Sequence, residues 1–124
     1  MSTRRFSPGM AALDNKIYVA GGFGDLGPES EPLCGVALTS VECYDTSTNT
    51  WSDVADMNIA RYCHALVSCH GKLFAIGGRD VDGSYFDDIE VYNPDTNTWT
   101  ELQLKLDGKV AYTGASLIKK YLLM

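Results

Sequence analysis

Two stretches of this chain are nearly the same. Residues 41–54 read VECYDTSTNTWSDV, and residues 89–102 read IEVYNPDTNTWTEL. The aromatic residues that keep their places are Tyr44 and Tyr92, and Trp51 and Trp99, so the same interval separates both pairs. An internal period of roughly 20–50 residues is typical of proteins that stack copies of one small structural unit.

One insertion separates the two copies. NKIYVAGG at 15–22 returns as GKLFAIGG at 71–78, after a longer interval than the one that separates the aromatic pairs. The difference falls in 23–38, FGDLGPESEPLCGVAL, whose Gly, Pro and Glu content is typical of a long loop. The expected organisation is a first copy over 5–56 with the inserted loop 23–38, a second copy over 57–104, and a partial third copy or a closing strand over 105–124.

Each copy has the residue pattern that is typical of short strands. Segments of four to six residues, rich in β-branched and aromatic types, alternate with turn formers. No segment sustains a 3.6-residue apolar period, so we expect almost no helix. The expected strands cover 9–13, 16–20, 40–44 and 51–54 in the first copy and 64–69, 72–76, 88–92 and 99–102 in the second. The fold class is therefore all-β, with four antiparallel strands in each copy.

A four-stranded sheet of this size cannot bury both of its faces alone, so we expect the copies to stack face to face. In such a stack the Gly pairs end an apolar strand where a Cβ would clash or φ must be positive. The Tyr and Trp side chains would fill the space between neighbouring sheets. The residues with these structural roles are Gly21, Gly22, Tyr44, Trp51, Gly77, Gly78, Tyr92 and Trp99. The pattern predicts blades of a β-propeller.

The order of an apolar strand that ends in Gly-Gly, then a Tyr and then a Trp, as at Gly78, Tyr92 and Trp99, resembles the kelch repeat. The resemblance covers about residues 5–104, and VECYDTSTNTW is especially similar to the third strand and turn of the kelch-like proteins. It implies a kelch β-propeller, usually of five to seven blades, that acts as a protein-binding platform. In many members this platform follows a BTB domain and recruits substrates to a cullin-based ubiquitin ligase, whereas others bind actin filaments.

This chain departs from the pattern, since it has two full copies and no BTB domain. The leading hypothesis is a non-catalytic protein-binding kelch module, the substrate-recognition part of a cullin-type ubiquitin ligase adaptor. The alternative is an actin-binding or other cytoskeletal scaffold protein. The resemblance places the ligand face on the loops that join strands two to three and four to one. The partner-binding residues expected from this are Arg5, Phe23, Thr39, Ser40, Arg61, Arg79, Tyr85 and Asp88.

Arg5 and Arg61 occupy the same place in both copies, just before the first strand. In one interpretation they line the binding face, as the resemblance implies, and two arginines there would suit an acidic peptide or degron. In the other they donate hydrogen bonds to turn carbonyls of the next blade. The sequence favours neither.

The Cys and His residues of CHALVSCH at 63–70 suggest a zinc site, but the spacing does not suit one. Neighbouring strand residues point to opposite faces, and six residues span roughly 20 Å, whereas zinc ligands converge within about 2.3 Å of one point. Its two cysteines, Cys63 and Cys69, align with Ser7 and Leu13 of the first copy, which are small or apolar positions. We therefore expect no metal and no cofactor, and we expect four reduced thiols. For Cys34, in the inserted loop, a redox-sensing role is the alternative.

Catalytic patterns such as G-x-S-x-G or a P-loop are missing from the sequence, so we do not expect an enzyme. The net charge of -6 argues against nucleic acid or an anionic membrane surface as the main partner. No apolar run approaches the roughly 20 residues of a membrane span, and the start lacks the apolar region of a secretory signal. We expect a cytoplasmic protein that self-associates when expressed alone, because two blades would leave apolar faces bare.

Overall fold

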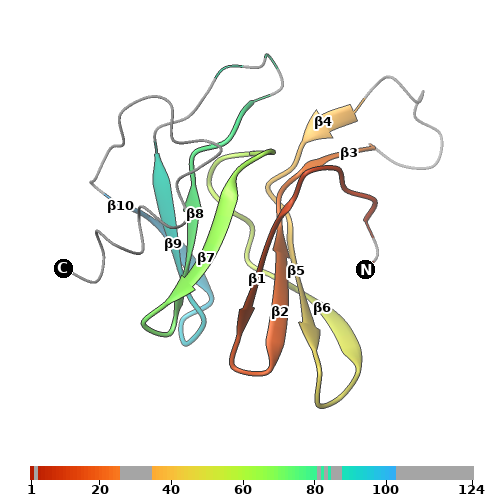
Figure 1. Cartoon of the computed structure of the whole chain (residues 1–124), viewed down its shortest axis with the longest axis vertical. Coiled ribbons are helices and arrows are strands. Elements are labelled where there is room, and N and C mark those ends of the chain that lie inside the picture. Colours follow the sequence, from red (N-terminus) through yellow and green to blue (C-terminus); the bar gives the residue numbers. More distant parts are fainter. Residues whose placement is uncertain (2, 26–34, 81, 83, 85–87, 103–124) are drawn as a thin grey trace.

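The computed structural model consists of two four-stranded antiparallel sheets that stand side by side (Figure 1). It describes residues 1, 3–25, 35–80, 82, 84 and 88–102. Blade 1 has the strand order β1-β2-β5-β6, and blade 2 has the order β7-β8-β9-β10. The strands of blade 1 are β1 (Gly9–Leu13), β2 (Lys16–Ala20), β5 (Val41–Asp45) and β6 (Thr50–Val54). Those of blade 2 are β7 (Ala65–Cys69), β8 (Lys72–Ile76), β9 (Ile89–Asn93) and β10 (Thr98–Leu102).

All eight strands expected from the sequence are present, within one residue of the expected bounds, so the all-β fold with four strands per copy is confirmed. Short turns that contain residues with positive φ join the outer pairs, as at Asn49 (φ 56°) and Asn97 (φ 52°). Asn tolerates this left-handed conformation better than most residues. The described residues contain no helix that could cross a membrane.

The insertion adds a small third sheet. Its two ends form β3 (Phe23–Asp25) and β4 (Gly35–Ala37), which pair as an antiparallel hairpin. The sequence predicts a loop over 23–38, and this is corrected at both ends of the segment. The strand pairing was missed because the Gly, Pro and Glu content of the segment indicates a loop, while the two pairing segments, FGD and GVA, are only three residues long. Residues 26–34, with Cys34, lie outside the described part.

The two blades pack face to face through one shared apolar core. We call the blade face that holds the Tyr and Trp of the repeat its leading face, and the opposite one its trailing face. The leading face of blade 2 packs on the trailing face of blade 1, where the Tyr18 and Tyr92 rings lie 5.8 Å apart. The Trp99 indole nitrogen donates to the Ala55 carbonyl at 2.9 Å. Trp99 is therefore a wedge between blades.

Trp51, the equivalent residue of blade 1, does not have this role in the described structure. Its exposed fraction is 42%, against 8% for Trp99. The physical reason is its position, because the leading face of blade 1 has no further described sheet against it. The expectation of a buried wedge is thus corrected for Trp51.

The Gly pairs end the second strand of each blade, with φ near 63° at Gly21 and 64° at Gly77. A Cβ at Gly21 would lie 2.5 Å from the Arg61 carbonyl oxygen, which belongs to the connection between the blades. Gly22 donates its amide to that same carbonyl at 2.7 Å. Both the backbone conformation and the close approach therefore require glycine.

Candidate protein-binding face

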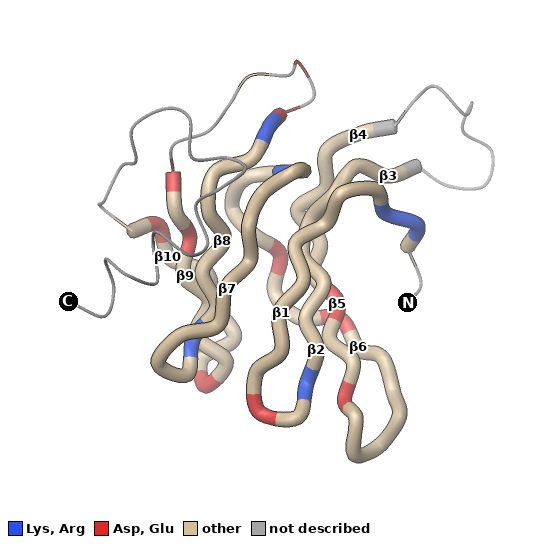
Figure 2. Tube along the Cα trace, viewed as in Figure 1, with Lys and Arg blue, Asp and Glu red and all other residues tan. Residues whose placement is uncertain are grey.

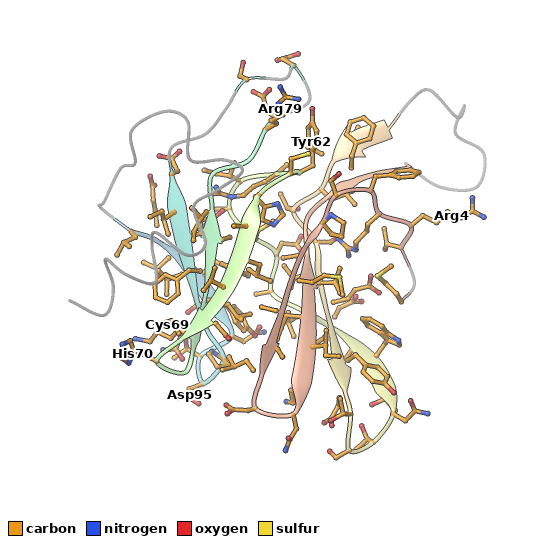
Figure 3. All side chains as sticks on the ribbon, in the orientation of Figure 1. Arg4, Tyr62, Cys69, His70, Arg79 and Asp95 are labelled. Carbon is orange, nitrogen blue, oxygen red and sulfur yellow. The ribbon has the colours of Figure 1, made fainter. Side chains whose placement is uncertain are left out.

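The longer connections of both blades gather at one end of the molecule, which we call the loop end. It carries the connections from β2 to β5 and from β8 to β9, together with the segment 55–64 between the blades. Tyr62 and Arg79 lie at this end, whereas Cys69, His70 and Asp95 lie at the opposite end, beside the tight turns (Figure 3). The grouping of the expected loops at one end follows from the antiparallel order of the strands.

Arg5 is held inside blade 1. Its Nη1 donates to the carbonyls of Gly21 (2.8 Å) and Ser40 (2.9 Å), and its Nη2 donates to Ser40 Oγ (3.0 Å). The same Nη2 lies 3.1 Å from Glu42 Oε2, and the two side chains are 0% and 3% exposed. The guanidinium thus joins the ends of β2 and β5.

Arg61 repeats this arrangement in blade 2. It donates to the carbonyls of Gly77 (2.8 Å) and Asp88 (3.1 Å) and pairs with Glu90 at 3.1 Å, with both side chains fully buried. The Glu90 carboxylate also accepts the main-chain amide of Asn58 at 2.6 Å. Through Arg61 and Asn58, the Glu90 carboxylate therefore holds the connection between the blades against blade 2.

These contacts favour the structural interpretation of the two arginines, with one correction: each guanidinium donates to carbonyls of its own blade and not to those of the next blade. Neither guanidinium is accessible to a partner in this structure, so we leave Arg5 and Arg61 out of the proposed binding face. The argument for an acidic peptide, which depends on these two charges, loses that support. Their partners, Glu42 and Glu90, were not predicted, although these two residues recur at the same interval as the aromatic positions.

Three other expected site residues make hydrogen bonds that hold the backbone at the loop end. The Thr39 carbonyl accepts the Met57 amide at 2.9 Å, and the Asp88 carbonyl accepts the Gly77 amide at 3.0 Å. Ser40 uses both its carbonyl and its hydroxyl to hold Arg5. All three remain partly exposed. Tyr85, the remaining loop residue that we expected in the site, lies outside the described residues.

Phe23 and Arg79 lie on either side of a tyrosine that the sequence analysis did not select. The Phe23 and Tyr62 rings meet edge to face with centroids 5.4 Å apart. Tyr62 and Arg79 form an isolated antiparallel bridge, with N···O distances of 3.2 and 2.8 Å. The two side chains lie close together in Figure 3. A signal for Tyr62 did exist, since the first copy has Phe6 at the same place, next to the repeated arginine.

His64 lies between the two blades, in contact range of Gly9 and Gly21 of blade 1. Burial lowers its pKa to about 3, the charge of Arg61 acts in the same direction, and the Ala20 backbone opposes both. Neither ring nitrogen reaches hydrogen-bond geometry with a described residue. The ring fits against Gly9 and Gly21, where a Cβ would come within 3.0 Å of it. His64 is therefore a neutral packing residue at ordinary pH.

Charged residues are spread over both ends of the described structure (Figure 2). Among these residues no group of three or more His, Cys, Asp or Glu has the arrangement of a metal site. Cys43, Cys63 and Cys69 are free thiols, and burial is the main cause that raises the pKa of the Cys43 thiol. A raised pKa reduces the thiolate fraction, so Cys43 is poorly suited to nucleophilic chemistry.

Two stacked four-stranded sheets with their longer connections at one end are the architecture of kelch-type β-propeller blades. The family model of the kelch motif matches residues 4–58 and 60–103, so the chain belongs to the kelch-motif family. A solved structure of YjhT shares the fold with a TM-score of 0.68, at 18% identity, over 78% of this chain and 37% of that chain.

Two curated relatives illustrate the range of similar proteins. Kelch-like protein 25 of Xenopus tropicalis is 32% identical over 118 residues, which are 95% of this chain and 20% of that protein. An F-box/kelch-repeat protein of Arabidopsis thaliana is 43% identical over 68 residues, which are 55% of this chain and 18% of that protein. The chain thus spans about a fifth of the length of these relatives. Kelch repeats are generally protein-interaction modules.

Proposed function

We propose that this chain is a non-catalytic protein-binding module and that it supplies part of the substrate-recognition surface of a cullin-type ubiquitin ligase adaptor in the cytoplasm. The observation that carries the proposal is the cluster of Phe23, Tyr62 and Arg79 at the loop end. Tyr and Arg are enriched among the residues that dominate binding energy at protein interfaces. The names of several relatives, such as a Kelch repeat and BTB domain-containing protein of Xenopus tropicalis, support the adaptor role.

The buried ion pairs support the proposal in a second way. A binding face loses affinity when its side chains must be ordered on association. Here Arg5 and Arg61 fix the strand ends from which Ser40, Arg79 and Asp88 emerge. The loop-end residues Phe23, Thr39, Ser40, Tyr62, Arg79 and Asp88, with Tyr85, are the proposed partner contacts. Arg79 with a neighbouring aromatic ring would favour a partner with a carboxylate beside an apolar side chain.

The test uses the full-length protein that contains these residues, purified from cells with its associated proteins. The double variant Tyr62→Ala/Arg79→Ala should still recover the cullin, but it should lose a set of proteins that the wild type captures. These proteins should also accumulate in cells that express the variant. Thr96→Ala, in the exposed turn at the opposite end, is the control and should behave as the wild type does. Equal recovery of every partner by the double variant would exclude this face.

An actin-binding scaffold is the second candidate, carried only by the family resemblance. Filament co-sedimentation separates the two functions, because the adaptor hypothesis predicts that the chain stays in the supernatant at all filament concentrations. Saturable pelleting that Tyr62→Ala/Arg79→Ala abolishes would favour the scaffold.

A further inference from the structure

We draw no further inference here: the strongest candidate, the cavity of about 260 Å³ on the trailing face of blade 2, lined by residues of β8, β9 and β10, carries none because nothing among the described residues shows what covers that face.

Discussion

At the residue scale, the buried ion pairs explain why an arginine and a glutamate recur in both copies. Removing one partner of a buried pair leaves the other charge uncompensated in a low-dielectric environment. We therefore expect Arg61→Ala to lower the free energy of unfolding by about 3–5 kcal/mol. Denaturant titration measures this change. A loss of partner binding at unchanged stability would instead show that Arg61 acts on the surface, which contradicts its contacts with Gly77, Asp88 and Glu90.

His64 gives the protein a defined response to acid. Its pKa is lowered to about 3 from an ordinary value of 6.5, so below pH 6.5 the unfolded chain binds a proton that the folded chain excludes. The contribution of His64 to the free energy of unfolding is constant above pH 6.5. It falls as the pH decreases toward 3, by up to about 1.4 kcal/mol per pH unit.

The measurement is the free energy of unfolding between pH 7 and pH 4, for the wild type and for His64→Gln, whose side chain does not titrate. The difference between the two curves isolates His64 from the carboxylates. As the pH falls, the free energy of unfolding of the wild type should decrease more than that of His64→Gln. Parallel curves would mean that His64 is accessible to water and protonates freely in the folded state.

The sequence predicts the site only in part, because it shows which residues recur but not where their side chains point. The recurrence of Arg5 and Arg61 was visible, whereas their burial depends on Glu42 and Glu90, across the blade. Tyr62 was missed since its contact with Phe23 joins residues on different loops. Trp51 and Trp99 are equivalent in sequence and differ in exposure because, within the part of the chain that the structure describes, a blade packs against Trp99 and none packs against Trp51.

At the scale of the element, the same substitution in the two blades should have different costs. Trp99→Ala removes a wedge that is 8% exposed and should cost about 3–5 kcal/mol of stability. Trp51→Ala should cost less than about 1 kcal/mol, because much of its ring is already in water. Denaturation midpoints of both variants provide the comparison. Equal losses would contradict the packing of blade 2 on blade 1.

The glycine turns offer a second matched pair. Gly21 and Gly71 both have positive φ, at 63° and 74°, but only Gly21 has backbone atoms within reach of an added Cβ. Gly71→Ala should carry only the conformational cost, about 1–2 kcal/mol, whereas Gly21→Ala should cost clearly more because the Arg61 carbonyl must move. Thermal melts of the two variants decide this. A similar shift in both would mean that the connection between the blades is loose.

Strands and their order could be predicted well, because the alternation of apolar residues and turn formers is local. The hairpin of β3 and β4 could not, because its pairing closes over an insertion that has no second copy to compare. The insertion thus marks the limit of inference from repetition.

At the scale of the whole molecule, the two blades pack face to face, and both the core and the loop end depend on this packing. Nuclear Overhauser effects between ring protons test it most directly. We expect cross-peaks between Tyr18 and Tyr92, which lie in different blades 5.8 Å apart, as well as between Tyr92 and Trp99, which lie in one blade 5.0 Å apart. Cross-peaks within the blade and none between the blades would contradict the stacked arrangement, and with it the loop-end face.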